Sequence, residues 1–188
     1  MDIKNVSVVL ASASPRRKEL LSQAGCTFEV IPAEGEEKIH DKSPDAIVLM
    51  LSKQKAMEVA AKCDSNTLVI GADTVVAAEG KILGKPKDYE DAFRMLSKLR
   101  NSCHSVYTGV TIIYGDKVKS FAEETRVYVR NITDEQLLDY IHLGECMDKA
   151  GAYGIQGRFG AYVEKIEGDY FNVVGLPICR LMREIEEM

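Results

Sequence analysis

Apolar and polar residues follow one another along the first half of this chain in blocks that predict alternating strands and helices. Residues 6–11 form an apolar run typical of a buried strand, and a helix is expected to follow from Pro15 to Gly25 with Ser14 as its N-cap. The β-branched segment 27–31 predicts a second strand. A long helix is expected over residues 45–62.

The second half has a different pattern, dominated by hairpins. Residues 67–78 are strand-like but interrupted at 71–74, and a helix is expected after Asp88. Long strands are predicted at 105–114 and 118–130, a helix from a capping box at 133–136 to about residue 142, a strand at 161–166, a turn at 168–177 and a closing helix. Together the two halves predict an α/β protein with a mixed sheet.

Charge and cysteine content narrow the classes of function. A net charge of −5 argues against a broad nucleic-acid or membrane-surface interface, which requires a basic field. No apolar run approaches the roughly 20 residues needed to span a bilayer. The five cysteines are scattered, odd in number and contain no C-x-x-C pair, which is typical of reduced thiols in a cytoplasm.

The stretch VLASASPRRKELL places cations in the first turn of a predicted helix, where the backbone N–H groups already form a positive pole. A strand, small residues and a helix N-terminus form an arrangement that binds phosphate. Ser12 and Ser14 would add hydroxyl donors, and Arg16 and Arg17 become favourable once a multiply charged anion is bound. The alternative is a solvated basic turn whose arginines pair with neighbouring acidic residues.

Asp73, in the segment GADT, is a charged residue within a strand-like run. It is either a buried structural hydrogen-bonding group or a carboxylate of a functional site, and ligands of open α/β sheets gather at strand ends. Such a carboxylate serves as a general base or a metal ligand. With Glu36 and Glu37 it would form an oxygen site for Mg²⁺, although each of these glutamates also suits a solvated loop.

Two glycine-containing segments do not fit the common nucleotide-binding motifs. GKILGKPKD has the wrong spacing for a Walker A loop, which leaves Lys85 as a candidate cation on a short turn. DKAGAYGIQGRFG lacks the G-x-G-x-x-G pattern. It is either a loop folded around a ligand, with Gln156 contacting the edge of a base, or a tight turn between a helix and a strand.

Five segments in order resemble the Maf family of nucleoside triphosphate pyrophosphatases: LASASPRRKELL, GADTVV, LGKPKDYEDAFRMLSKLRNSCHSVYTGV, DKAGAYGIQG and VVGLP. The segment DKAGAYGIQG is similar to the dTTP/UTP branch, because the branch that acts on 7-methyl-GTP differs there. The resemblance covers nearly the whole chain. It implies one domain over residues 1–188 with a two-lobed, inosine-triphosphatase-like α/β fold, in which an elongated mixed sheet is flanked by helices and a central cleft separates the lobes.

The resemblance also implies roles for individual residues. Asp73 would be the proton acceptor, and Glu37, Lys55 and Lys85 further site residues; the substrate would contact Ser12, Ser14, Arg16, Arg17, Thr74 and Gln156. A divalent cation, Mg²⁺ or Mn²⁺, would bind Asp73 and Glu37, with the choice between Glu36 and Glu37 open. The protein would be a cytoplasmic homodimer with a house-cleaning role in nucleotide metabolism.

The mechanism implied is attack of a water, activated by Asp73, on the α-phosphorus of dTTP, UTP or a modified pyrimidine triphosphate. The products are the nucleoside monophosphate and pyrophosphate, and cations near the leaving phosphates matter most. Two alternatives differ in outcome. A nucleotide-sensing regulator of cell division would bind triphosphate without hydrolysis, and a triphosphatase would release single phosphates.

Overall fold

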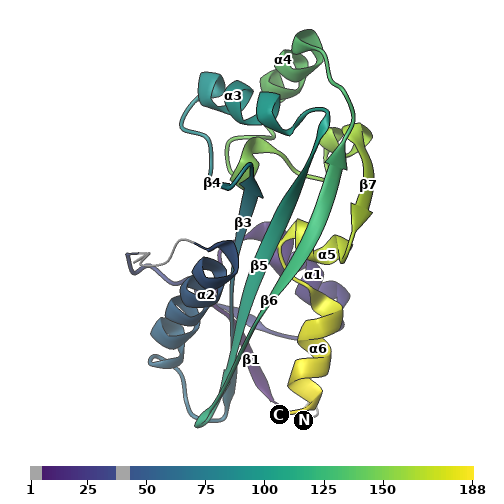
Figure 1. The fold of residues 1–188 in the computed structure, drawn as a ribbon. Helices are drawn as coiled ribbons and strands as arrows, with labels where there is room; N and C mark the ends of the chain where they lie inside the picture. The colour runs from purple at the N-terminus through teal and green to yellow at the C-terminus, as the bar shows by residue number, and fades with distance from the viewer. Residues whose placement is uncertain (1–5, 37–42) are drawn as a thin grey trace. The chain divides into compact units, whose positions relative to one another are not determined.

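The computed structural model describes residues 6–36 and 43–188, and Figure 1 shows the order of its elements. The strands are β1 (Ser7–Leu10), β2 (Glu29–Val30), β3 (Thr67–Ala78), β4 (Lys81–Leu83), β5 (Ser102–Tyr114), β6 (Lys117–Val129) and β7 (Val163–Glu167). The helices are α1 (Pro15–Gln23), α2 (Pro44–Ala60), α3 (Tyr89–Leu99), α4 (Asp134–His142), α5 (Tyr170–Val174) and α6 (Ile178–Glu186), with 3₁₀ turns η2 (Ala150–Ala152) and η3 (Arg158–Tyr162).

Within the described residues, seven strands form one mixed sheet in the order β2-β1-β3-β5-β6-β7, with β4 paired to β3. β1 runs parallel to both β2 and β3, whereas β4 is antiparallel to β3 and β7 is antiparallel to β6. The expected α/β class with a mixed sheet flanked by helices is therefore confirmed. No helix in the described part of the chain combines the length and apolarity needed to cross a membrane.

The chain divides into two compact units. The first unit comprises Met1–Asp73, Thr108–Glu123 and Gly175–Met188, and the second comprises Thr74–Tyr107 and Glu124–Val174. The boundary passes through the long strands β3, β5 and β6. Each unit therefore contains part of the sheet and its own helices.

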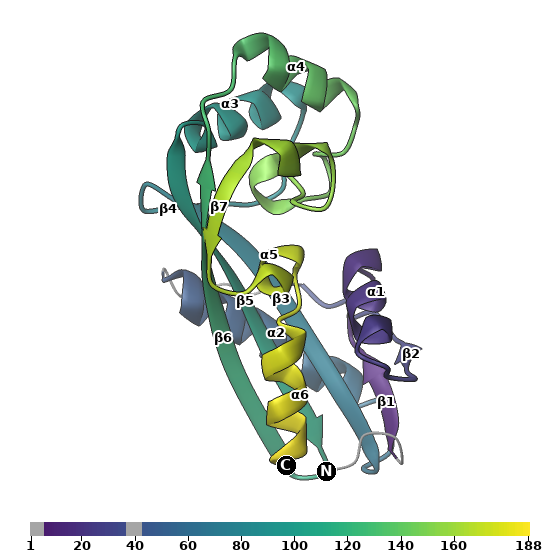
Figure 2. The ribbon, with the colours of Figure 1, turned by 90° about the vertical axis from the view of Figure 1, so that its right-hand side faces the viewer.

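In the first unit, α2 covers one face of the sheet while α1 and α6 lie on the other, as Figures 1 and 2 show. Beneath α2, the apolar side chains of Val9, Val69 and Ile113 from the strands pack with Ala56 and Val59 from the helix. The apolar runs at residues 6–11 and 67–78 thus form neighbouring parallel strands, as expected for strands that are covered on both faces.

In the second unit, α3 and α4 pack on a core built around aromatic rings. The ring centroid of Phe159 lies 5.2 Å from that of Tyr140, 4.7 Å from that of Tyr153 and 5.6 Å from that of Tyr162. The caps predicted for the two helices are confirmed: Asp88 accepts a hydrogen bond from the backbone of Asp91, and the capping box begins α4.

Two predictions of secondary structure are wrong. β3 runs without interruption through residues 71–74, because Asp73 is paired with a lysine and its neighbours hydrogen-bond within the sheet. The expected turn at 168–177 contains the short helix α5, whose start is stabilised by the Asp169 carboxylate accepting from the backbone of Phe171 at 2.8 Å. The second strand is also shorter than expected, with only Glu29 and Val30 paired.

Candidate active site

The turn between β1 and α1 lies at a switch point of the sheet. The chain leaves β1 through α1 to reach β2 on one side, and then crosses by α2 to β3 on the other side of β1. Helices α1 and α2 consequently lie on opposite faces. In open α/β sheets, ligands bind outside the carboxyl ends of strands at such points. The sequence places SASPRR there.

Arg17 connects three separate segments of the first unit. Its Nε donates to the carbonyl of Gly175 at 2.9 Å, and its Nη1 donates to Ser12 Oγ at 3.0 Å and to the carbonyl of Ala72 at 2.8 Å. These acceptors lie after β1, within β3 and before α6. Arg17 therefore fixes the β1–α1 turn against the residue that precedes Asp73.

The predicted N-cap of α1 forms in a modified way. Ser14 occupies the N-cap position and Pro15 the first helical position, but the Ser14 side chain makes no capping hydrogen bond. Instead, the hydroxyl of the buried Ser12 accepts from the Ser14 backbone N–H at 3.3 Å. Ser12 thus connects the turn to Arg17, and half-buried Arg16 follows on the first turn of the helix.

Lys55 and Asp73 form an ion pair inside the first unit. The Lys55 Nζ lies 2.5 Å from Asp73 Oδ1, and the two side chains retain 21% and 13% of their exposure. Lys55 comes from α2 and Asp73 from β3, 18 residues apart in sequence. Because both groups are partly shielded from water, their mutual attraction exceeds that of a surface pair.

Two glycines on neighbouring strands allow α2 to approach close enough for this pair. A Cβ at Gly71 of β3 would lie 2.4 Å from the carbonyl oxygen of Ser52, and one at Gly109 of β5 would lie 2.2 Å from that of Val48. No side chain fits at either distance, so the α2 backbone rests directly on the sheet. Since Gly71 and Asp73 are two residues apart on a strand, they share the α2 face.

A chain of hydroxyl groups, which begins in the core at Ser52 and Thr111, holds the same helix. Ser52 Oγ donates to the carbonyl of Leu49 at 3.0 Å and lies 3.0 Å from Thr111 Oγ1, which in turn lies 2.9 Å from Ser120 Oγ. Ser52 and Thr111 are fully buried. The hydroxyls connect α2 to β5 and β6, and Ser52 lies one helical turn before Lys55.

Thr74, Lys85 and Gln156 belong to the second unit. Thr74 follows Asp73 on β3 and so points to the opposite face of the strand. Lys85 and Gln156 are exposed, on loops that meet each other: the backbone N–H of Gly151 donates to the carbonyl of Gly84 at 3.0 Å. The structure thus brings the Lys85 loop and the Gln156 loop together.

The acidic segment before α2 is described only in part. Glu36 is exposed, and Glu37 lies outside the described residues. The preceding backbone is fixed to α2, because the Glu58 carboxylate accepts from the N–H groups of Glu34 and Gly35, at 3.0 Å each. These hydrogen bonds lower the pKa of Glu58.

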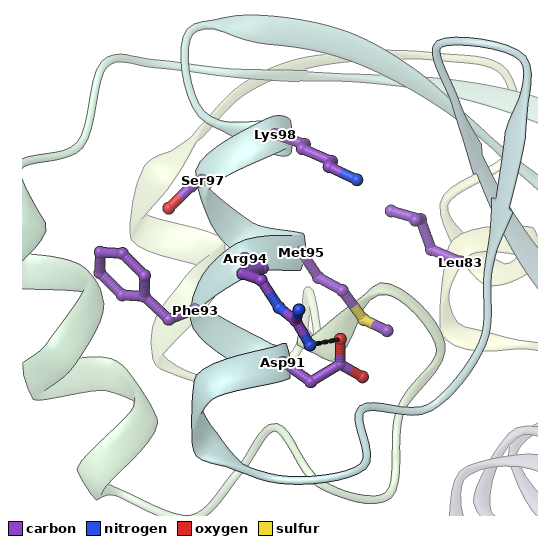
Figure 3. A pocket seen from close by; sticks show the side chains of 7 residues that line it. All are labelled: Leu83, Asp91, Phe93, Arg94, Met95, Ser97 and Lys98. Atoms are coloured by element: carbon purple, nitrogen blue, oxygen red, sulfur yellow. Dashed lines mark hydrogen bonds and ion pairs between the residues drawn. The ribbon is translucent and has the colours of Figure 1, made fainter.

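A shallow pocket in the second unit contains none of the predicted site residues. It has a volume of about 560 Å³ and is lined by Leu83 and by residues of α3, with Asp91 and Arg94 paired at 3.0 Å (Figure 3). Figure 3 shows Phe93 and Met95 on different sides of the helix. We assign this pocket no part in the candidate site.

Several residues that support the site have only indirect signals in the sequence. Gly109 lies inside a predicted strand, and a glycine there indicates close approach of another backbone. Gly175 lies in the segment VVGLP, but nothing local indicates that its carbonyl accepts from Arg17, 158 residues earlier. His104 and Glu145 of the second unit, described below, have no local signal.

Comparison with known proteins gives consistent matches over most of the chain. A family model described as Maf-like protein matches residues 7–188. Proteins named dTTP/UTP pyrophosphatase are similar to this chain: that of Agathobacter rectalis is 52% identical, covering 96% of this chain and 97% of its own length. The protein of Thermoanaerobacter sp. is 53% identical and covers 94% of this chain and 93% of its own length. That of Carboxydothermus hydrogenoformans is 51% identical and covers 97% of this chain and 98% of its own length.

Among solved structures, the Ham1 protein of Staphylococcus aureus has a TM-score of 0.42 and 17% identity, over 65% of this chain and 71% of that chain. This likeness is too low to argue from.

Proposed function

Because the chain belongs to the Maf-like protein family, we propose that it hydrolyses dTTP and UTP to the nucleoside monophosphate and pyrophosphate. The names of relatives that are about half identical over nearly their whole length support this activity. They give no support to a regulator that senses nucleotides without hydrolysis. We further propose that the protein accepts modified pyrimidine triphosphates and has a house-cleaning role in nucleotide metabolism. In the same proposal it acts as a homodimer in the cytoplasm.

The observation that best supports a hydrolase is the Lys55–Asp73 pair. Asp73 directly follows Ala72, whose carbonyl accepts a hydrogen bond from Arg17 of the β1–α1 turn. A sensor needs cations for the triphosphate but has no use for a partly buried carboxylate beside them. In a hydrolase, such a group serves as a general base.

In the proposed reaction, Asp73 accepts a proton from a water that attacks the α-phosphorus. A bond forms between the water oxygen and the α-phosphorus, and the bond from this phosphorus to the α–β bridging oxygen breaks. The electron pair leaves with pyrophosphate. Lys55 orients the Asp73 carboxylate and supplies positive charge, which matters most where negative charge grows in the transition state.

The triphosphate is held, in this proposal, by the β1–α1 turn. The positive pole of α1, the hydroxyls of Ser12 and Ser14, and Arg16 and Arg17 supply donors and charge. Arg17 acts chiefly by holding the turn, since its Nε and Nη1 already donate to protein oxygens. Arg16, Thr74 and Gln156 are proposed to select the base, and Lys85 to assist at the phosphates; these assignments rest on the family pattern.

A divalent cation, Mg²⁺ or Mn²⁺, fits the oxygen chemistry of this region. No cluster of three or more His, Cys, Asp or Glu side chains suited to a metal exists among the described residues. Mg²⁺ commonly binds through one or two carboxylates together with substrate phosphates and water. Asp73, with Glu37, is the proposed ligand set, and the bound ion would neutralise phosphate charge.

The test is a panel of nucleoside triphosphates incubated with the purified chain and Mg²⁺ or Mn²⁺, with the products separated by ion-exchange chromatography. We expect dTTP and UTP to yield monophosphate and pyrophosphate. Binding without turnover would favour the sensor, and release of single phosphates would favour a triphosphatase. Either result would contradict the proposal.

A further inference from the structure

Gln156 lies in a tight turn, residues 154–157, which we call the Gln156 turn. The backbone N–H of Gly157 donates to the carbonyl of Gly154 at 3.2 Å and closes the turn. Ile155 and Gln156 occupy its two central positions, and Gln156 is exposed. Both ends of the turn, and the residue before it, are held by side chains of other elements.

Two backbone N–H groups hold the turn, one at its first residue and one directly after its last residue. The N–H of Gly154 donates to Tyr140 Oη of α4 at 3.3 Å. Immediately after the turn, the N–H of Arg158 donates to Glu145 Oε2 at 3.0 Å. A Cβ at Gly157 would lie 2.1 Å from the same carboxylate oxygen, so only glycine leaves room for Glu145 to reach Arg158.

The residue before the turn is held by a buried polar pair. Tyr153 Oη lies 2.7 Å from His104 Nε2, and the rings meet edge to face with centroids 5.3 Å apart. The two residues are only 5% and 2% exposed. Desolvation lowers the pKa of His104 to about 4, so the imidazole is neutral at physiological pH.

Packing alone does not account for this pair. Phe159 fills a neighbouring place in the same core without any polar atom, and the buried Nδ1 of His104 makes no hydrogen bond to any of the described residues. A buried hydroxyl and imidazole carry a desolvation cost that two apolar rings would avoid. Their hydrogen bond is directional, so it fixes the Tyr153 hydroxyl against His104 in addition to the packing of the rings.

We propose that Tyr153, held by His104, and Glu145 are positioning residues that fix the Gln156 turn and thereby set the discrimination between pyrimidine base edges. The inference rests on the proposed function, in which Gln156 contacts the base. A site that hydrogen-bonds one base edge discriminates against another only when its polar groups are held in place.

The experiment measures kcat and KM for UTP and CTP, which differ only at the base edge, in the wild type and four variants. Tyr153→Phe removes the bond to His104, and Glu145→Ala removes the acceptor for Arg158. Glu145→Gln keeps one acceptor oxygen. Ile141→Val, in the same core, is the control for loss of stability alone.

We expect the UTP-to-CTP ratio of kcat/KM to fall about tenfold in Tyr153→Phe and in Glu145→Ala, while kcat for UTP falls much less. Glu145→Gln should restore most of the ratio, and Ile141→Val should leave it unchanged even where its melting temperature falls as far. Thermal melting of every variant accompanies the kinetics.

A wild-type ratio in Tyr153→Phe overturns the role of the His104–Tyr153 pair, and a wild-type ratio in Glu145→Ala overturns that of Glu145. Equal loss of the ratio in Ile141→Val shows that general destabilisation is the cause, which also overturns the inference. Wild-type protein that hydrolyses neither UTP nor dTTP overturns the proposed function itself, a result that is distinct from any change in selectivity.

Discussion

The Lys55–Asp73 pair and the Gln156 turn are placed by different physical means. Lys55 and Asp73 extend from helix α2 and strand β3, and the α2 backbone rests on the sheet at Gly71 of β3 and at Gly109 of the neighbouring β5. Gln156 extends from a short turn held by hydrogen bonds to side chains. Backbone contact fixes the position of an ion pair rigidly but permits almost no substitution, whereas side-chain hydrogen bonds can be altered without loss of the fold.

The largest effect should come from the Lys55–Asp73 pair itself. Asp73→Asn removes the proposed base while keeping the shape of the side chain, so we expect kcat to fall about 10²–10⁴-fold. Triphosphate binding should persist, because the cations of the turn remain. Steady-state kinetics and nucleotide titration test this together; a variant that retains wild-type kcat would exclude Asp73 as the base.

A substitution at the contact between the α2 backbone and β3 should reduce activity nearly as much. Gly71→Ala places a Cβ 2.4 Å from Ser52 O, which must push α2 away from β3 and lengthen the distance between Lys55 and Asp73. We expect a loss of about 3 kcal/mol in stability and a fall in kcat of roughly a hundredfold.

Gly84→Ala is the control for stability, since a Cβ there would meet no atom of the described part of the chain within 4 Å. Chemical denaturation compares the two variants. Equal stability of Gly71→Ala and the wild type would show that α2 does not depend on this contact.

A smaller effect is expected at Arg17. The pole of α1 alone would predict that removing a cation stabilises the helix. The three hydrogen bonds predict the reverse, a loss of about 2 kcal/mol in Arg17→Ala, because buried acceptors lose a charged donor. Arg17→Lys should recover only part of it, since an ammonium lacks the guanidinium fork.

Lys18→Ala provides the matched control on the same helix. In the described part of the chain, the Lys18 ammonium makes no hydrogen bond or ion pair. Lys18→Ala removes the same positive charge as Arg17→Ala but breaks no hydrogen bond. Its unfolding free energy should therefore stay near that of the wild type. A comparable loss in both variants would mean that charge, not hydrogen bonding, stabilises the turn.

The buried histidine of the second unit predicts a dependence of stability on pH. The pKa of His104 is lowered from 6.5 to about 4, so the unfolded chain takes up a proton before the folded chain does. Its contribution to stability is complete above about pH 6.5 and is lost as the pH falls toward 4, by about 3 kcal/mol.

Replacing His104 with leucine should remove this component, so that the difference in unfolding free energy between wild type and variant changes with pH over that range. Urea denaturation at several pH values measures it. A difference that does not vary with pH would contradict a buried neutral His104.

Features that depend on residues close together in the sequence could be predicted from the sequence alone. The starts of α3 and α4 depend on hydrogen bonds between residues three positions apart, and both caps are as predicted. The interruption predicted in β3 is wrong because Asp73 is neutralised by a lysine 18 residues away, which no local pattern reveals.

The connections of the site are likewise non-local. The position of Arg17 in the turn predicts a role for it, but two of its acceptors lie 55 and 158 residues away. The glycines under α2 and the support of the Gln156 turn depend on which elements pack together. Residue types and motif order therefore predicted the candidates, while their hydrogen-bond partners required the fold.

In the proposed reaction, water attacks the α-phosphorus of the triphosphate and not the β- or γ-phosphorus. Hydrolysis of dTTP in water enriched in ¹⁸O, followed by mass spectrometry of both products, tests it most directly. We predict that one ¹⁸O atom enters the monophosphate and none enters pyrophosphate. Label in pyrophosphate or in free phosphate would contradict attack at the α-phosphorus, because the water would then have attacked another phosphorus.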